Sequence, residues 1–309
     1  MPLAPAVNGR AMMALGGTCL VAGLAFAVFG SGSRTVYIAS VLFLGCFLIL
    51  VGMYNSMAPS PGAETEAYTV KDPEGRAYTL RVIEDDAVIG APIRMGQFWE
   101  AHFQPKFKEY AEASLRPGDV ILDIGANIGS HSVYLANFAD VYAFEPQDSV
   151  LQVLRWNAAN NQLAHRIHVQ DFGLYSETKT LNMNPVAKND DGSLNHGGTG
   201  IRPSLAGEVQ PEAGEQVRVR KFDEFWSRHM HPRVGFIKID IEGGEVEALR
   251  GMTEMLRRDW PLIQFEDWGD AHPNGLPRPK DVLEPLGYVI RQIDSHNWLA
   301  VPPRLAQRF

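Results

Sequence analysis

Acidic side chains at the ends of three apolar runs are the residues of this 309-residue chain best suited to chemistry on a ligand. They are Asp123, Glu145 and Asp240, and each run is typical of a buried strand bounded by turn residues. The carboxyl ends of parallel strands meet at one edge of a sheet, and ligands bind there where the strand order reverses. The sequence therefore predicts one ligand site to which all three acids contribute.

The turn after Asp123 carries Gly125 and Gly129, with Asn127 where a dinucleotide fingerprint has its second glycine. This turn fits S-adenosylmethionine, which has no phosphate and whose amino-acid moiety lies across backbone N–H groups near a carboxylate. Gly125 permits a close approach of backbone to ligand, and Gly129 permits the following helix, 130–138, to pack tightly. Asp123 is expected to contact the ligand's ammonium group. The alternative is a carboxylate that binds the turn's own amides.

The next two strand ends supply candidate contacts to a nucleoside. Glu145 stands 20 residues after Gly125, the offset at which an acid binds ribose hydroxyls. The alternative is an acid that stabilises a helix N-terminus. Asp171 and Phe172 follow the run 166–170, where a polar group and an aromatic face would suit adenine. An ordinary strand-end acid and a core phenylalanine are the alternative for this pair.

The segment after the fourth apolar run is expected to carry the catalytic residues. Asp240 and Glu242 could act as the general base for an acceptor hydroxyl or hold a divalent cation, and we assign no metal ligand. Glu245 is interpreted as a structural acid at a helix N-terminus. Lys238 alternates with two apolar residues, so a buried neighbour of these acids and a surface lysine both stay open.

Residues 182–216 form a loop insertion rich in Gly, Asn, Asp and Pro. A loop of this length in a compact domain is usually functional or disordered. We expect a lid over methyl donor and acceptor, with a disordered surface insertion as the alternative. His196 lies in this loop and is predicted as a catalytic residue because it is suited to proton transfer near neutral pH. A solvated loop histidine is the alternative.

Three segments together resemble the FkbM family of S-adenosylmethionine-dependent methyltransferases. They are Leu-Asp-Ile-Gly-Ala-Asn-Ile-Gly at 122–129, Ala-Phe-Glu-Pro at 143–146 and Lys-Ile-Asp-Ile-Glu-Gly-Gly-Glu at 238–245, in the family's order and spacing. Asn195–Gly198 also resembles the family's Asn-x-Gly-Gly segment near the active site. The resemblance covers about residues 95–300. It implies methylation of hydroxyl groups, often on sugars.

The fold class expected is α/β, a class I methyltransferase with a Rossmann-like, mostly parallel sheet of order 3-2-1-4-5-7-6. The domain should span 95–309, after a linker and small β-hairpin at 59–94. A closing antiparallel pair, 287–293 and 297–301, distinguishes this fold from simple dinucleotide folds. Further helices are predicted at 97–113, from a Ser149 cap to Asn161, at 244–256 and at 281–286.

The N-terminal region reads as a membrane hairpin over residues 1–58. Residues 11–33 and 35–63 carry no charged side chain, and the segments 11–30 and 36–54 are each long enough to span a bilayer. A cleaved signal peptide is the alternative for the first segment. Either arrangement returns the chain after residue 57 to the cytoplasmic side.

Composition narrows the range of partners. A net charge of −8 without a basic stripe argues against nucleic acid. The two cysteines, Cys19 and Cys46, have no zinc-site spacing and make no disulfide framework. We therefore expect a membrane-anchored O-methyltransferase whose acceptor is a lipid-linked sugar, a glycolipid or another membrane-associated hydroxyl. The alternatives are an NAD(P)-dependent oxidoreductase and a catalytically silent membrane scaffold with the same fold.

Overall fold

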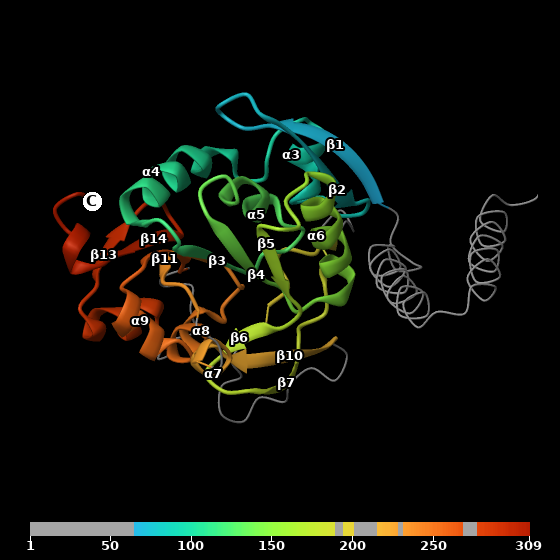
Figure 1. Ribbon diagram of the computed structural model, residues 1–309. Coiled ribbons are helices and arrows are strands. Elements are labelled where there is room, and N and C mark those ends of the chain that lie inside the picture. The colour runs from blue at the N-terminus through green and yellow to red at the C-terminus, as the bar shows by residue number, and fades with distance from the viewer. Residues whose placement is uncertain (1–64, 189–193, 201–214, 228–230, 268–276) are drawn as a thin grey trace, which may run out of the picture. The chain divides into compact units, whose positions relative to one another are not determined.

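The computed structural model describes residues 65–188, 194–200, 215–227, 231–267 and 277–309 (Figure 1). The chain divides after Ala58, and all of the described residues belong to the unit Pro59–Phe309. The predicted membrane spans, 11–30 and 36–54, lie outside the described residues. Within the described ranges, no helix combines the length and the apolar character needed to cross a membrane.

A seven-stranded sheet forms the centre of this unit, in the order β13-β14-β12-β11-β3-β4-β5. The five strands from β12 to β5 run parallel, and β14 is antiparallel to both of its neighbours. The predicted order 3-2-1-4-5-7-6 is confirmed. The strands are β3 (Val120–Ile124), β4 (Asp140–Phe144), β5 (Ile167–Gln170), β11 (Val234–Ile239), β12 (Leu262–Glu266), β13 (Val289–Gln292) and β14 (Asn297–Val301).

Helices cover both faces of the sheet, which is why its central strands are apolar on both sides (Figure 1). Every residue of β3 and β11 is buried. One face packs against α4 (Gln104–Ser114), α5 (Ser130–Leu135) and α6 (Asp148–Asn160). The other packs against α7 (Phe222–Ser227), α8 (Glu245–Arg250), α9 (Thr253–Asp259) and α10 (Pro279–Leu283).

The predicted N-terminal hairpin is confirmed as β1 (Thr65–Lys71) and β2 (Ala77–Ile83). Two asparagines of the α6 region fasten it to the domain. The Asn157 side chain accepts from the Arg81 N–H at 2.6 Å and donates to the Ile128 carbonyl at 2.7 Å. Asn161 bonds both backbone groups of Thr79 at 2.8 Å. Asn157 therefore joins the hairpin to the turn after β3.

A second small sheet, of order β6-β10-β7, follows the end of β5. It is built from β6 (Gly173–Tyr175), β7 (Lys179–Asn182) and β10 (Gln216–Lys221), and a short pair, β8 (Ala187–Lys188) and β9 (Leu194–Asn195), lies between them in sequence. The ends of the predicted 182–216 insertion are thus strands rather than loop. Residues 189–193 and 201–214 of that insertion lie outside the described residues.

Several predicted helix boundaries are wrong. The helix predicted at 97–113 begins at Gln104, after a 3₁₀ turn, η1 (Ala101–Phe103). The helix predicted at 244–256 is two helices, α8 and α9, which are separated at Gly251 and Met252, and an added side chain at Gly251 would overlap the Tyr175 carbonyl. Ser149 does not cap α6, which begins at Asp148 with no side-chain cap. The helix predicted at 281–286 starts at Pro279 and ends as a 3₁₀ turn, η3 (Glu284–Leu286).

Two short elements had no predicted counterpart. The helix α3 (Gly90–Arg94) follows the hairpin, and a last 3₁₀ turn, η4 (Pro303–Leu305), follows β14. The Arg94 guanidinium donates to the carbonyls of Ile83 and Asp86, at 3.0 and 2.8 Å. This side chain therefore holds the end of β2 against α3. Neither element has enough residues to produce a periodic pattern in the sequence.

Candidate active site

The turn between β3 and α5, residues 125–129, touches the end of β11. Gly125 has a φ of +79°, and a Cβ at this position would overlap the carbonyl oxygen of Asp240. Only glycine fits, because there is no space for a side chain and because glycine adopts this left-handed conformation without steric cost. The close approach predicted at Gly125 is therefore to the neighbouring strand end. Gly129, also left-handed, packs the start of α5 against Leu154 of α6.

Asn127 lies at the crest of this turn with a left-handed φ of +49°. Asparagine is one of the few residues that adopt this conformation readily, since its side chain can bond the local backbone. Here the Asn127 Oδ1 accepts from the N–H of Ile128 at 2.7 Å. A turn closed in this way needs no glycine at its second position, which separates it from the dinucleotide fingerprint.

Glu145, at the end of β4, is bound to the same turn. Its carboxylate accepts hydrogen bonds from the backbone N–H of Asn127 at 3.0 Å and of Gln147 at 2.9 Å. Burial raises the pKa of Glu145 to about 7, although both backbone hydrogen bonds act to lower it. The residue is 3% exposed and lines the cavity beside the turn. It is placed where a ligand's hydroxyl groups could reach a carboxylate.

Asp123 lies beneath the turn rather than in the cavity. It is fully buried, accepts a hydrogen bond from the Ser132 hydroxyl at 2.5 Å and lies 3.8 Å from the Lys238 ammonium. The cavity-lining residues do not include it. This placement differs from the expected contact with a ligand ammonium. The reason is the register: Asp123 pairs with Lys238 inside the sheet, one step before β3 ends.

Asp171 and Phe172 do not line the cavity either. The Asp171 carboxylate pairs with the Arg218 guanidinium at 2.9 Å and is half-exposed. Phe172 is buried in the core, with its ring centroid 5.7 Å from that of Phe144. The adenine contacts expected of these two side chains stay a prediction, and neither side chain lines the cavities beside the turn. The chain reaches the cavity only at the next residues, Gly173 and Leu174.

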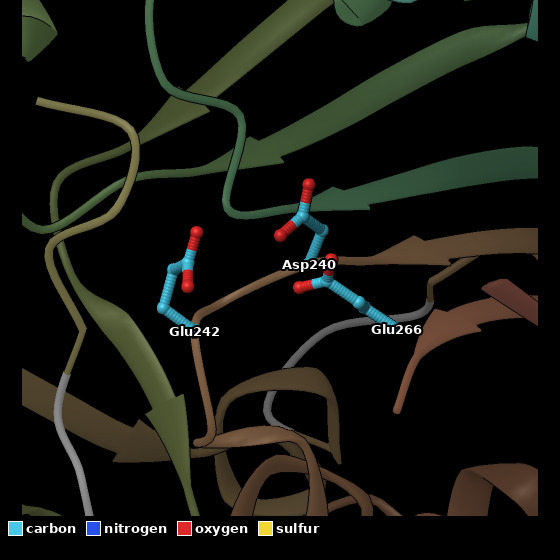
Figure 2. Close-up of side chains that lie close together, drawn as sticks. All are labelled: Asp240, Glu242 and Glu266. Carbon is cyan, nitrogen blue, oxygen red and sulfur yellow. The ribbon is translucent and has the colours of Figure 1, made fainter. Parts of the chain in front are cut away.

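Three carboxylates converge at the ends of β11 and β12. Figure 2 shows Asp240, Glu242 and Glu266 directed toward one space, with one oxygen of each within 4.8 Å of the others. Asp240 and Glu266 are adjacent because β11 pairs with β12 up to Ile239 and Phe265. Glu242 follows in a left-handed turn, with a φ of +55°. Carboxylates in this arrangement can accept hydrogen bonds from hydroxyl groups or hold a hard cation.

Glu266 is not among the predicted site residues. Its signal was the position at the end of an apolar run, the same signal that marked Asp240. What the sequence lacked was the pairing of the two strands, which brings the two carboxylates together.

Glu245 has the structural role that its position predicted. Its carboxylate accepts from the backbone N–H of Ile241 at 3.0 Å and of Gly243 at 3.2 Å, which fixes the turn that carries Glu242. Burial raises the pKa of Glu245 to about 7 against the lowering effect of these hydrogen bonds.

His196 does not face the cavity. It is buried, and its Nε2 lies 3.3 Å from the Asp85 carboxylate, which ties its loop to the residues after β2. The loop reaches the site through its glycines instead: Gly197 and Gly200 line the cavity, and a Cβ at Gly200 would lie 2.5 Å from the Glu242 carbonyl oxygen. The expected proton-transfer role of His196 therefore has no support in this geometry.

Two small cavities lie on either side of the 125–129 turn. One, of about 60 Å³, is lined by Gly125, Glu145, Asp240 and Glu242 among others. The second, of about 40 Å³, is lined by Ser130, Lys238 and again Asp240. The Ser130 hydroxyl is buried and has no hydrogen-bond partner among the described residues. An unpaired buried hydroxyl is costly, so it is suited to bind a polar ligand group.

A larger hollow of about 650 Å³ lies at the opposite end of the sheet, where β3 and β4 begin. Its lining includes Arg116, Asp119, Asp140 and Arg166. Asp119 and Asp140 are paired with arginines, Asp140 with Arg166 at 3.2 Å, and the hollow lacks the carboxyl ends of the strands. We therefore assign the ligand site to the cavities beside the turn, despite their smaller size.

Fold and site together define the class of protein. A parallel sheet with one antiparallel strand inserted beside its edge, and a ligand turn after its first strand, is a class I methyltransferase fold. Residues 123–289 match the family described as the methyltransferase FkbM domain, and the chain belongs to this family. The resemblance found in the sequence is thereby confirmed, and the oxidoreductase alternative is disfavoured.

The chain is also similar to named proteins. Hexuronic acid methyltransferase AglP of Haloferax volcanii is 28% identical over 171 residues, which cover 54% of this chain and 61% of the relative. The 31-O-demethyl-FK506 methyltransferase FkbM of Streptomyces tacrolimicus is 28% identical over 209 residues, covering 60% and 75%. The crystal structure of methyltransferase FkbM from Methylobacillus flagellatus KT is 20% identical, with a TM-score of 0.38 and coverage of 65% and 52%. The chain thus spans less than two thirds of the length of AglP.

S-adenosylmethionine is the cofactor that this fold implies, and the residues around the turn fit it. Glu145 offers a buried carboxylate to hydroxyl groups, and Ser130 offers an unpaired buried hydroxyl. Gly125, Asn127 and Asp240 line both cavities, so one ligand can lie across the turn and reach each side.

Proposed function

We propose that this chain is an S-adenosylmethionine-dependent O-methyltransferase that acts on a hydroxyl group of a sugar, a glycolipid or another membrane-associated acceptor. One observation carries the proposal: the turn that fits the donor and the carboxylates that fit a hydroxyl acceptor border the same cavity. Gly125 and Glu145 line it from the donor side, and Asp240 and Glu242 from the other.

The donor side would hold the cofactor through the Ser130 hydroxyl and through the Glu145 carboxylate, which can accept hydrogen bonds from ligand hydroxyls, because the backbone N–H groups of 125–129 already bond within the protein. When bound, S-adenosylmethionine supplies a methyl group activated by a sulfonium. The chain's part is to orient donor and acceptor and to exclude water. Burial of Glu145 and the close contact of Gly125 with Asp240 make this side rigid before the ligand arrives. Rigid placement lowers the entropic cost of reaching a reactive geometry.

The acceptor side is assigned to the three converging carboxylates. The Asp240 side chain is 32% exposed, so an acceptor can reach it, and one of its oxygens is held by Lys238 at 3.3 Å. We assign Asp240 to accept the hydrogen bond of the reacting hydroxyl and to take its proton as the new O–C bond forms. Glu242 and Glu266 would bind neighbouring hydroxyl groups of the acceptor. AglP, by its name, acts on a hexuronic acid, which supports a sugar acceptor.

The membrane tether is proposed from the uncharged stretches 11–33 and 35–63. Two spans, 11–30 and 36–54, would leave the methyltransferase domain on the cytoplasmic face. A site held at the membrane surface meets acceptors that are themselves anchored in lipid. This location supports the choice of a lipid-linked sugar or glycolipid.

Transfer of labelled methyl from S-adenosylmethionine into a membrane-lipid extract, resolved by mass spectrometry, tests the function. We expect label in a saccharide-bearing lipid, and we expect it to resist mild alkali because a methyl ether does. Release of the label as methanol would indicate a methyl ester on a carboxylate and contradict hydroxyl methylation. Asp240→Asn should slow transfer about 100-fold or more, the range of a lost general base. Asp140→Asn, at the far end of the sheet, is the matched control and should transfer normally.

Protease treatment of sealed vesicles tests the location. In vesicles with the cytoplasmic face outward, we expect the domain 65–309 to be digested without detergent. Protection of the domain in these vesicles would contradict the cytoplasmic placement while leaving the methyl-transfer proposal intact.

A further inference from the structure

A buried lysine lies between the donor turn and the acceptor carboxylates. Lys238 is the last residue but one of β11, paired with Asp123 on β3 and with Gln264 on β12. Its side chain is 6% exposed. A buried ammonium is costly unless charged or polar partners surround it, so each of its contacts bears on the position of the others.

The ammonium of Lys238 has three partners among the described residues. It lies 3.3 Å from the Asp240 carboxylate and 3.8 Å from that of Asp123, and it donates to the Gly125 carbonyl at 3.3 Å. The ammonium thus has hydrogen bonds to the Gly125 carbonyl and the Asp240 carboxylate, whereas Asp123 is an ion-pair partner beyond hydrogen-bond distance. Burial alone would lower the pKa of Lys238, but the carboxylates of Asp240 and Asp123 raise it, and the side chain stays charged.

These three partners belong to different parts of the site. Asp123 is in the sheet, Gly125 begins the donor turn, and Asp240 stands on the acceptor side. The backbones of Gly125 and Asp240 are also in direct contact: they lie so close that no Cβ would fit between Gly125 and the Asp240 carbonyl. A change at Asp240 therefore reaches the donor turn through the ammonium as well as through the backbone.

We infer that Lys238 is a positioning residue that couples the two halves of the site: it holds the Gly125 carbonyl and the Asp240 carboxylate on one ammonium. The inference rests on the proposed function, in which residue 125 faces the methyl donor and residue 240 the acceptor. With Asp240 neutralised, the ammonium would shift toward Asp123 and away from the Gly125 carbonyl. The donor turn would then bind its ligand less well, whatever that ligand's charge.

Calorimetric titration of the full chain with S-adenosylmethionine and with S-adenosylhomocysteine, which lacks the sulfonium charge, tests this coupling. We expect Lys238→Met to weaken both ligands about tenfold, equivalent to about 1.4 kcal/mol. Asp240→Asn should weaken the binding of both ligands by the same factor, and this factor should be smaller than for Lys238→Met. The double variant should bind both ligands as Lys238→Met alone does. Ser132→Ala, which removes the other partner of Asp123 and leaves the Lys238 contacts in place, should bind both ligands as the wild type does.

Two results would overturn the coupling. The first is an Asp240→Asn effect on S-adenosylmethionine only, since that indicates direct attraction to the sulfonium. The second is a double variant whose loss of affinity equals the product of the losses in the two single variants, since that indicates independent effects. If Lys238→Met does not fold, the comparison of the two ligands on Asp240→Asn still decides. Wild-type protein that binds neither ligand would overturn the proposed function itself, and the inference with it.

Discussion

The carboxylate of Glu145 accepts a hydrogen bond from the backbone N–H of Asn127 at 3.0 Å, so the acid of the second parallel strand holds the turn of the first. A second bond, from the N–H of Gln147, fixes the same carboxylate to the start of α6. The site's donor half is therefore built by one side chain that joins two strand ends. Loss of its charge should reduce the affinity for the ligand more than it reduces the stability of the fold.

Above the Glu145 pKa of about 7, where the carboxyl is ionised, Glu145→Gln should weaken the binding of S-adenosylmethionine about 10- to 100-fold, because a charge-assisted hydrogen bond contributes about 1.5–3 kcal/mol. Calorimetry measures the affinity. Glu215→Gln is the matched control: its carboxylate accepts from the Asp148 N–H at the same end of α6 but lies outside the cavity. Equal losses in the two variants would assign the effect to α6 and not to the ligand.

Gly125→Ala should destabilise the fold by about 2–5 kcal/mol, the sum of left-handed strain and overpacking against the Asp240 carbonyl. Gly118→Ala separates the two causes. Gly118 has a similar φ of +85° but has nothing within 4 Å of an added Cβ, so it should lose only about 1–2 kcal/mol. Urea unfolding gives both values. Similar losses would show that Asp240 can move aside, contrary to the tight contact seen here.

Stability should fall as pH rises from about 4.5 to about 7, because the folded protein keeps a proton on Glu245 that the unfolded chain releases in this range. The free energy of unfolding then decreases by up to about 1.4 kcal/mol per pH unit from this one group. Glu245→Gln has no charge to bury, so its unfolding free energy should depend less on pH. Chemical denaturation at several pH values measures the slope.

The control for this pH dependence is Glu254→Gln, an acid exposed at the start of α9, which should keep the wild-type slope. A Glu245→Gln variant with the wild-type slope would mean that the buried carboxyl is ionised throughout the range.

Glu266→Gln should slow methyl transfer about tenfold or more, because this carboxylate lies beside Asp240. The affinity for S-adenosylmethionine should stay unchanged, because Glu266 does not line the cavity beside the 125–129 turn. Glu109→Gln, on the exposed face of α4, should have no effect on either quantity. Transfer rates with and without a chelator complete the test. A loss of transfer in EDTA that Mg²⁺ restores would assign the three carboxylates to a cation instead of to acceptor hydroxyls.

Local patterns in the sequence were sufficient for the sheet. Apolar runs of five or six residues, each ended by an acid or a turn, identify β3, β4, β11 and β12 because buried parallel strands are apolar on both faces. The order of strands followed from the family resemblance and the closing antiparallel pair. Helix ends were less well predicted: α8 ends at Arg250, and the next residue, Gly251, packs against the carbonyl of Tyr175, a residue 76 positions earlier.

The chain by itself thus determined the fold class, the glycine turn and the acids at the strand ends, because each is a property of neighbouring residues. Tertiary structure decided which of the predicted site residues line the cavities beside the turn. Asp123 is drawn into a buried pair with Lys238, Phe172 into the core and His196 toward Asp85, whereas Glu266 joins Asp240. The physical reason is that the pairing of strands and the packing of side chains from separate parts of the sequence set which side chains share a face. In this way the turn at Gly125 and the carboxylate of Asp240 come to share the ammonium of Lys238.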